Sequence, residues 1–291
     1  MTNTLSVSIG GGLACTEADK YLQRFILAKE FHSEWFYPGI EVKSFFDSFP
    51  GLIWNGGRVM EGMAESLSIA ECKKKVEFFN QRNIGVYFTF TNNLLTEEHL
   101  PNTVCNQVLK AFESPLNAVI VCSKLLENYI RSSYPQYKII YSVTHVTYDK
   151  AILLKAAKEY DLVVIPPEWN RDLALLSCFP AEKVEIMLCE PCIPYCPNRK
   201  EHYRATDKAN LGYTVDPEAS PHKCKYKALF PGELMKDLSL AEMLTIFTET
   251  GIRHFKLSNR ALDLPRRIEH ISRYFVRKEY AEVFTIYMTD A

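Results

Sequence analysis

The sequence lacks any uncharged apolar run that approaches the ~20 residues a membrane-spanning helix needs. Its first residues, Met1 to Ile9, also lack the basic segment and long apolar stretch of a secretory leader. Both absences favour a cytoplasmic protein. An excess of charge is missing too, because 34 Lys and Arg residues balance 35 Asp and Glu residues, leaving a net charge of −1. We therefore expect no strong nucleic-acid footprint and no attraction to an anionic membrane.

Several catalytic motifs are also absent. The sequence has no Gly-x-Ser-x-Gly elbow, no His-Glu-x2-His zinc helix and no P-loop, so serine hydrolases, zincins and NTPases have no motif in their favour. The triplet Gly10-Gly11-Gly12 lacks the spaced third glycine of a dinucleotide fingerprint, which disfavours a Rossmann domain.

The sequence does contain a regular alternation of short apolar strands and amphipathic helices. Eight such strands predict a parallel sheet with right-handed crossovers, and eight strands can close a barrel. The whole chain, residues 1–291, suits a single (β/α)8 TIM-type barrel, which needs about 250 residues. An open doubly wound sheet is the alternative. The predicted strands are Leu5–Ile9, Leu52–Asn55, Ile84–Thr89, Ala118–Cys122, Ile139–Val143, Leu162–Ile165, Val184–Leu188 and His254–Leu257.

Helices are predicted between these strands, and two connections are unusually long. The segment Thr16–Gly51 is rich in aromatic residues, so we expect a helix and a packed loop there. Residues 189–232 are rich in Pro, Cys and Lys with little periodicity, and a loop of this length inside a domain is usually functional. The predicted helices are Met63–Asn80, Glu97–Ala111, Ser123–Tyr134, Tyr148–Tyr160, Arg171–Ser177, Leu238–Thr250 and Pro265–Val276.

The long second connection carries a cluster of cysteines. Cys189, Cys192 and Cys196 have a C-x2-C-x3-C spacing, and Cys224 follows 28 residues later. Thiolates are the ligands that iron–sulfur clusters and zinc select, and the prolines between these cysteines stiffen the loop that presents them. The cluster also begins where the seventh predicted strand ends, on the face that carries the active site in barrels of this kind.

The members of the cluster differ in how strongly they indicate a ligand. Cys192 and Cys196 are the strongest candidates and Cys224 is a plausible third, whereas Cys189 ends a strand and could point into the barrel wall. With three thiolates, a group such as His202 could complete the site. Ordinary buried thiols are the alternative for the whole cluster and the favoured interpretation of the remaining cysteines, Cys15, Cys72, Cys105, Cys122 and Cys178.

Three short blocks of the sequence resemble a known family. Gly251–Arg260 is similar to the signature GI-x-x-F-K-[IL]-x-G-R of the collagenase-like peptidases, peptidase family U32, with Asn259 in place of the signature glycine. Cys192–Tyr203, with the pattern Cys-x3-Cys-Pro-x-Arg-x2-His-Tyr, and Thr89–Leu95 are similar to outlying members of that family. The cysteine spacing differs from that of the better-known members.

The resemblance implies a barrel and a set of activities. Family members are implicated in peptide cleavage, in oxygen-independent hydroxylation during ubiquinone biosynthesis, and in hydroxylation of tRNA and rRNA bases. Several bind a [4Fe-4S] cluster through four cysteines, which favours a cluster over zinc at Cys189, Cys192, Cys196 and Cys224. The ubiquinone-pathway members are reported to work in pairs, which makes a protein partner plausible.

Polar side chains at the ends of the predicted strands would ring the mouth of the barrel. We expect Glu190, Lys256 and Arg260 to be catalytic, and Glu190 to pair with Lys256, which lies in an apolar strand and needs a partner. A structural ion pair is the equal alternative. The basic stretch after the cysteines, residues 199–204, is expected to be a solvated face. Further strand-end candidates are Asn55, Arg58, Thr91, Asn92, Asn93, Ser142, Thr144, His145, Glu168 and Asn170, of which the asparagines at 92 and 93 and the histidine are expected to shape turns.

The sequence thus leaves two kinds of function open. The first is a cluster-bearing enzyme that acts on a small or nucleotide-like substrate, by hydroxyl transfer without molecular oxygen or as a subunit of such an enzyme. The second is a non-catalytic barrel that iron–sulfur or zinc stabilises and that serves as a partner subunit. A peptidase comes third, because no nucleophile or metal-bound water is recognisable.

Overall fold

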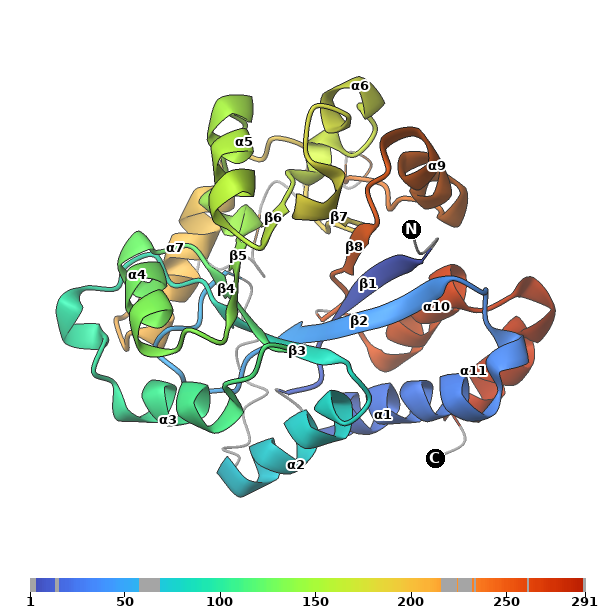
Figure 1. Ribbon diagram of the computed structural model, residues 1–291, viewed down its shortest axis with the longest axis horizontal. Coiled ribbons are helices and arrows are strands. Elements are labelled where there is room, and N and C mark those ends of the chain that lie inside the picture. The colour runs from blue at the N-terminus through green and yellow to red at the C-terminus, as the bar shows by residue number, and fades with distance from the viewer. Residues whose placement is uncertain are drawn as a thin grey trace.

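A computed structural model describes residues 4–13, 16–57, 69–215, 224, 232, 234–260 and 262–289. Its eight parallel strands follow one another in chain order around a closed barrel (Figure 1). The first strand pairs with both the second and the eighth, which closes the sheet and confirms the TIM-type barrel. The strands are β1 (Leu5–Gly10), β2 (Ile40–Asp47), β3 (Gly85–Phe90), β4 (Ala118–Val121), β5 (Lys138–Tyr141), β6 (Leu162–Val164), β7 (Val184–Met187) and β8 (His254–Leu257).

The helices surround this sheet. Buried aliphatic and aromatic side chains fill the space between strands and helices as one continuous core. Among the described residues, no helix is both long and apolar enough to cross a membrane. The helices are α1 (Thr16–Phe31), α2 (Ile69–Asn80), α3 (Thr103–Phe112), α4 (Lys124–Ser133), α5 (Lys150–Glu159), α6 (Leu173–Leu176), α7 (Arg199–Asn210), α9 (Leu240–Thr250), α10 (Leu264–Phe275) and α11 (Ala281–Thr289).

A second, smaller group of apolar side chains fills the interior of the barrel. Alternate residues of the strands point inward, as the two-residue period of a strand requires. The inward-facing group is Phe46, Tyr87, Ala118, Ile120, Ile140, Val164 and Met187. The barrel is therefore a packed core, and space for a ligand is to be sought near its rim.

The second predicted strand is wrong. Leu52–Asn55 lies in irregular backbone after the turn at Pro50 and Gly51, and the strand in the sheet is Ile40–Asp47. The first half of that strand alternates buried and solvent-facing residues, including Glu41 and Lys43, so it does not read as an apolar run. The other seven predicted strands overlap strands of the structure.

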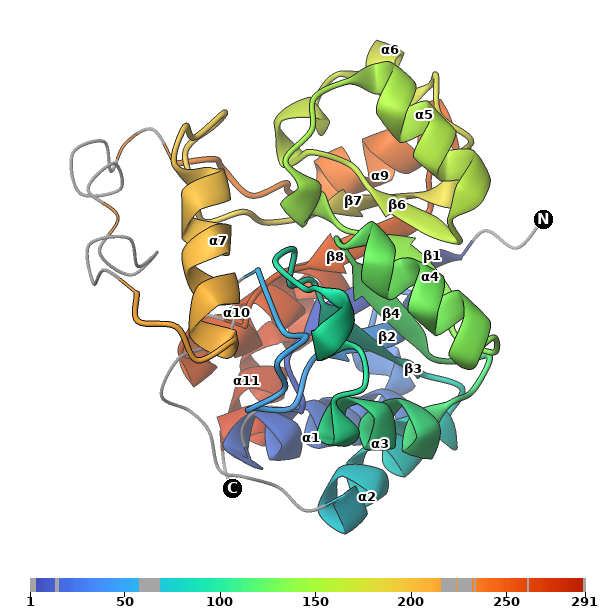
Figure 2. The same ribbon diagram turned by 90° about the vertical axis from the view of Figure 1, so that its left-hand side faces the viewer.

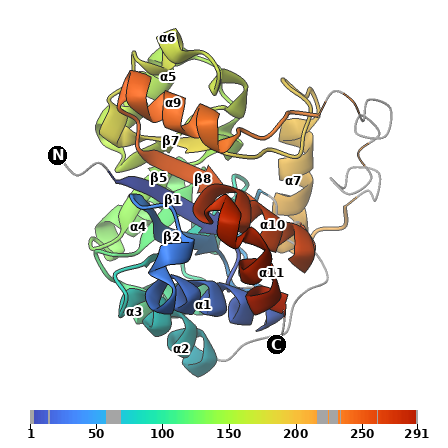
Figure 3. The same cartoon turned by 90° about the vertical axis from the view of Figure 1, so that its right-hand side faces the viewer.

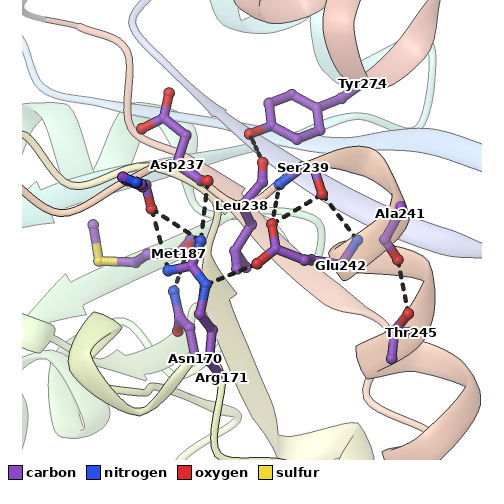
Figure 4. A network of polar contacts seen from close by, with 11 residues as sticks. Asn170, Arg171, Met187, Asp237, Leu238, Ser239, Ala241, Glu242, Thr245 and Tyr274 are labelled. Atoms are coloured by element: carbon purple, nitrogen blue, oxygen red, sulfur yellow. Dashed lines mark hydrogen bonds and ion pairs between the residues drawn. The ribbon is translucent and has the colours of Figure 1, made fainter.

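The helix predictions hold with changes at their ends. The predicted helix Glu97–Ala111 is interrupted at Pro101, so that a short 3₁₀ turn precedes α3, which Asn102 caps. The start of the predicted helix Met63–Asn80 lies outside the described residues, and its remainder is α2. A capping box formed by Ser239 and Glu242 begins α9 (Figure 4).

The long segment after β7 contains a helix that the sequence did not suggest. This helix, α7, spans Arg199–Asn210 and stands across the end of the barrel opposite the start of β1 (Figures 2 and 3). The strands point their carboxyl ends toward it, so α7 covers part of the face where barrel enzymes hold their active sites.

Candidate functional site

A pocket opens at the carboxyl end of the barrel. Its enclosed space is about 50 Å3, room for a few water molecules or one small chemical group, and it widens toward solvent. Phe46 and Met187 from the interior of the barrel form part of its floor. The polar residues in its wall come from strand ends or from the loops that follow them, and they include Thr91, Ser142, Thr144, Glu190, Lys256 and Arg260. The three residues predicted to be catalytic therefore line one pocket.

The ion pair of Lys256 differs from the predicted one. Lys256 Nζ lies 3.4 Å from Glu185 Oε2, and both side chains are buried. Glu185 points into the barrel, where its other oxygen accepts a hydrogen bond from Ser8 Oγ at 2.8 Å. Ser8 Oγ in turn accepts one from Ser44 Oγ at 2.9 Å. The expected pairing of Lys256 with Glu190 is therefore wrong, because the strand register brings the lysine to a glutamate inside β7 instead of to the one beyond its end.

The electrostatics of Lys256 follow from this position. Burial lowers the pKa of its ammonium, whereas the Glu185 carboxylate raises it. Nζ also lies 3.8 Å from the centre of the Phe46 ring, a cation–π contact that favours the charged form. The amino group of Lys256 thus lies at the floor of the pocket, between one carboxyl group and one aromatic face.

Arg260 also contacts this ring and is fixed by an ion pair of its own. Its Nη1 lies 3.2 Å from Asp47 Oδ1 and 3.5 Å from Thr89 Oγ1, so that the loop after β8 is tied to the ends of β2 and β3. Gly10 makes this arrangement possible, because a Cβ there would lie 2.9 Å from Arg260 Cγ and 3.0 Å from Phe46 Cζ. The cation belongs to the wall of the pocket and keeps its position through an ion pair.

Glu190 lies at the boundary between the pocket and the cysteine loop. It is buried, it lines the pocket, and its charge acts on Arg199 of α7. Burial by itself would lower the pKa of Arg199, but the carboxylates of Glu190 and Glu168 outweigh this and raise it. Arg199 thus lies close to two carboxyl groups, of which that of Glu190 belongs to the wall of the pocket.

Three of the four predicted ligands lie together. Cys192 and Cys196 pack with Ile193 in a small buried cluster that Met235 covers. Burial raises the pKa of the Cys196 thiol, the backbone amide of Asn198 lowers it, and the nearby thiols of Cys192, to which it is hydrogen-bonded, and Cys224 raise it further. All three thiols are buried, so they form a sulfur-rich surface shielded from solvent.

Cys189 lies apart from this group. It belongs to the continuous core between barrel and helices, where it lies near Tyr274 of α10. Among the residues that the structure describes, no set of three His, Cys, Asp or Glu side chains already has the geometry of a metal site. The soft donor set of Cys192, Cys196 and Cys224 nevertheless fits a thiolate-bound metal or cluster in its chemistry, because all three thiols are buried, Cys192 and Cys196 are hydrogen-bonded to each other, and Cys224 is near enough to act on Cys196.

A second pocket lies beside the first, under the side of α7. The two pockets share three lining residues, Thr91, Thr144 and Tyr203. His145 lines the second pocket and stacks on Tyr141 at a centroid distance of 3.9 Å. Burial lowers the pKa of His145 to about 4, so the imidazole is neutral at pH 7.

Asp207 anchors α7 and was not foreseen from the sequence. Its Oδ2 accepts a hydrogen bond from the backbone amide of Asn93 at 3.1 Å, and its backbone carbonyl accepts one from Asn92 Nδ2 at 3.1 Å. Asn210, one turn further along α7, donates to the carbonyl of Asn55 at 3.0 Å. The asparagines that follow β2 and β3 therefore hold the helix over the barrel, as shapers of loops rather than as reacting groups.

The remaining strand-end candidates are distributed as follows. Asn170 donates to the carbonyl of Met187 at 2.7 Å and supports the end of β7 (Figure 4). Arg58 lies outside the described residues. The basic stretch 199–204 is not simply a solvated face, because Arg199, His202 and Tyr203 are buried and only residues 200, 201 and 204 are exposed. That expectation was wrong because these residues form a helix whose inner face is polar.

Asp207→Asn should make the stability with which α7 packs against the barrel independent of pH between about 4 and 7. Burial raises the pKa of Asp207 to about 7, against the lowering effect of the Asn93 and Gly57 amides. Between pH ~4 and ~7 the folded state thus binds a proton that an unfolded aspartate, with a pKa of about 3.9, has lost. Stability therefore falls as pH rises through this window and stays low above it.

The measurement is hydrogen exchange of the α7 amides at pH 5 and pH 8, corrected for intrinsic rates. We expect wild-type α7 to lose protection at pH 8 by an amount equivalent to about 2 kcal/mol or more, since one pKa unit is about 1.4 kcal/mol. An asparagine side chain in place of Asp207 keeps an acceptor for the Asn93 amide, so the variant should keep its protection at both pH values. Equal pH dependence in the two proteins would refute the role given to this carboxyl.

Comparison with known proteins supports the fold. No protein-family model matches the sequence, and no curated protein matches it significantly. Among solved structures, the U32 peptidase Mk0906 is similar, with a TM-score of 0.57, 12% sequence identity, and coverage of 88% of this chain and 92% of that one. A fusion protein of a xylose isomerase-like TIM barrel and a 4-hydroxyphenylpyruvate dioxygenase matches with a TM-score of 0.31 and 10% identity, over 92% of this chain and 41% of that one. The chain thus shares the barrel architecture of a U32 peptidase.

Proposed function

We propose that this chain is an enzyme of the U32-like barrel type that binds an iron–sulfur cluster at Cys192, Cys196 and Cys224 and acts on a small or nucleotide-like substrate in the adjoining pocket. The observation that carries the proposal is the meeting of three buried thiols on the loop that leads from β7 to α7 and in the segment beyond it. That loop begins beside Glu190, which lines the pocket together with Lys256 and Arg260.

The cofactor would be held by the three thiolates, with zinc as the alternative metal. A cluster with fewer than four cysteine ligands can accept a further ligand, which is the chemistry that a catalytic centre needs. Cys189 is the least suitable of the four predicted ligands, because it lies in the core beside Tyr274 and not with the other three thiols. The reaction class in keeping with this cofactor is hydroxylation without molecular oxygen. The chain would carry it out alone or as one subunit of such an enzyme.

The side chains of the pocket would bind and orient the substrate. Lys256 presents a charged ammonium held by Glu185 and Phe46, which suits an anionic or carbonyl oxygen. Glu190 supplies a carboxyl group in the same pocket that can hold a proton or accept a hydrogen bond. The apolar floor, which includes Val164 and Met187, would exclude water from the side of the substrate that faces the barrel.

Anaerobic reconstitution with iron and sulfide tests the cofactor. Wild-type protein should become brown, with broad absorption near about 400 nm and up to about four irons per chain. Cys192→Ser and Cys196→Ser should each lose most of the bound iron, because a hydroxyl is a poor replacement for a soft thiolate. Iron and sulfide analysis together with the visible spectrum gives the measurement.

Two control variants separate ligation from other losses of thiol. Cys178→Ser removes an exposed thiol and Cys105→Ala removes a buried one in α3, and both should keep the full iron content. A colourless protein that contains one zinc would contradict the iron–sulfur cluster and favour the zinc-stabilised alternative. Full metal content in both ligand variants would show that the assigned thiols do not bind it.

Peptide hydrolysis is the second candidate, and the shared barrel of the U32 peptidase Mk0906 is the observation that favours it. Zinc bound by the same thiols would be the cofactor in keeping with that reaction, since a metal with an open position activates water. Metal-dependent cleavage of a mixed peptide library by zinc-loaded protein, lost in Cys196→Ser, would support this candidate over the first.

A further inference from the structure

We infer that a buried ion pair between Glu168 and Arg199 is the positioning element of the thiol loop and holds Cys192 and Cys196 at their mutual spacing. The inference rests on the proposed function for its meaning, since the loop needs a fixed shape only if its thiols bind something. Both side chains lie outside the set of proposed ligands and reach the loop from different elements. Glu168 belongs to the 3₁₀ turn Pro167–Trp169 after β6, and Arg199 is the first residue of α7.

Glu168 binds the loop on the side of Cys196. Its Oε1 accepts a hydrogen bond from the backbone amide of Tyr195 at 3.0 Å and one from Tyr148 Oη at 3.1 Å, and it forms an ion pair with Arg199 Nη1 at 2.7 Å. The Glu168 side chain is 0% exposed. A charged oxygen with three donors has a defined position, and it fixes the residue next to Cys196.

Arg199 binds the same loop on the side of Cys192. Its Nη2 donates to the carbonyl of Ile193 at 3.0 Å, and its backbone amide donates to the carbonyl of Cys196 at 3.2 Å. Nη1 also donates to Tyr148 Oη at 3.2 Å. The guanidinium thus joins the residue after Cys192 to the end of the loop, and its planar fork explains why an arginine suits this place.

The loop between these contacts has a shape that it would not adopt on its own. Tyr195 has a φ of 50°, a left-handed conformation that is unfavourable for a residue with a large side chain, and this side chain is 57% exposed. Its ring lies 5.0 Å from the Tyr148 ring, but a contact between rings does not fix a backbone torsion. The hydrogen bond from its amide to Glu168 supplies a constraint on the backbone itself.

The energetics of the pair also favour a positioning role. Two charges buried from water gain little net stability over well-packed apolar side chains, because desolvation offsets their attraction. What such a pair does provide is a defined geometry, since any displacement leaves a buried charge without its partner. Here the geometry is transmitted to two backbone groups, at Ile193 and Tyr195, each adjacent to a thiol residue.

Native-state alkylation of the metal-free protein provides the test. Chelator-treated, reduced chain is exposed to N-ethylmaleimide without denaturant, and labelling at each cysteine is followed by peptide mass spectrometry. In Glu168→Gln and Arg199→Met we expect Cys192 and Cys196 to react at least about tenfold faster than in wild type, because a hydrogen bond to a charged group contributes about a factor of ten or more. Arg199→Lys, which keeps the charge without the fork, should lie between wild type and Arg199→Met.

Two internal comparisons make the result specific. Cys72 and Cys105 are buried thiols in α2 and α3, remote from the loop in the chain, and their labelling rates should not change. Arg277→Met is the matched control, because Arg277 follows α10, forms an exposed ion pair with Glu279 at 2.9 Å and also donates to the carbonyl of Glu34 at 3.4 Å. It should leave the labelling of all four thiols unchanged.

The outcomes separate the inference from the proposed function. Wild-type labelling rates at Cys192 and Cys196 in both variants, or equal acceleration at all four thiols, would overturn the positioning role. Reconstituted wild-type protein that binds no metal would overturn the proposed function, whatever the labelling shows. If wild type binds iron and the inference is correct, Glu168→Gln and Arg199→Met should each retain less iron than Arg277→Met.

Discussion

Replacing Glu185 with glutamine should destabilise the barrel by about 3–5 kcal/mol, the cost of removing one partner of a buried ion pair. The ammonium of Lys256 would then remain inside the barrel without its carboxylate at 3.4 Å. The side chain of glutamine keeps an oxygen for the hydrogen bond from Ser8 Oγ, so the change isolates the loss of charge. Urea unfolding at pH 7, followed by circular dichroism, gives the free energy of unfolding.

A double-mutant cycle shows whether the loss comes from the pair. Lys256→Met removes the cation and keeps an apolar chain against the Phe46 ring. Combined with Glu185→Gln, it removes both charges, so we expect the double variant to be more stable than Glu185→Gln alone. The coupling free energy should be about 2 kcal/mol or more, within the range for groups in direct contact. Additive effects would mean that the two side chains do not interact in the folded protein.

The pH dependence has a defined sign. Burial lowers the pKa of Lys256 in the folded state, and loss of Glu185 lowers it further because that carboxylate raises it. The unfolded chain, with a lysine pKa of about 10.4, then binds the proton that the folded state releases. The stability of Glu185→Gln should therefore rise with pH between the two pKa values, and the difference from wild type should shrink at alkaline pH.

The barrel was predictable because the local patterns of the sequence agree with the fold. Seven of the apolar runs become strands, and helices follow most of them. The failure at β2 has a physical cause, since Ile40–Asp47 exposes Glu41 near the start of the strand and becomes wholly buried only from Ser44 onward. An apolar run marks a strand buried along its length, and a strand that is half solvated at one end escapes this criterion.

Only part of the candidate site could be predicted from the sequence. The positions of Glu190, Lys256 and Arg260 at strand ends placed them around one pocket, because parallel strands end at the same rim. The partner of Lys256 could not be predicted in this way, since it depends on the inter-strand register, which sets Met187 opposite Lys256 and leaves Glu185 two residues below. Acidic residues inside apolar strands were the available signal for this pair.

Helix α7 escaped prediction for a different reason. Its buried face carries polar groups, among them Arg199, His202 and Asp207, so it shows no apolar stripe at helical spacing. Two of these groups bind backbone groups of neighbouring loops, as Arg199 does at Ile193 and Asp207 at Asn93. The helix is therefore specified by tertiary hydrogen bonds, which leave no periodic pattern in the sequence.

Gly56→Ala should disrupt the contact between α7 and the barrel and destabilise the protein by about 3 kcal/mol, at the upper end of the usual cost of overpacking. A Cβ at Gly56 would clash with Asp207 Oδ1. It would also lie 2.5 Å from the amide nitrogen of Asn92 and 2.5 Å from the carbonyl carbon of Thr91. Two of these three atoms belong to the backbone of the loop after β3, which cannot yield without opening the rim. The expected result is loss of protection of the α7 amides in hydrogen exchange, together with a lower midpoint of urea unfolding.

Gly51→Ala is the matched control in the same connection between β2 and α2. Gly51 has a φ of 77°, and a Cβ there would have no heavy atom within 4 Å, so alanine costs only the left-handed backbone conformation, about 1 kcal/mol. It should lower global stability slightly and leave the protection of α7 relative to the barrel strands unchanged. If the two variants affect α7 equally, the close approach of Asp207 to the loop at Gly56 does not hold the helix over the pocket. A selective loss in Gly56→Ala would show that the cover of the candidate site depends on the absence of one side chain.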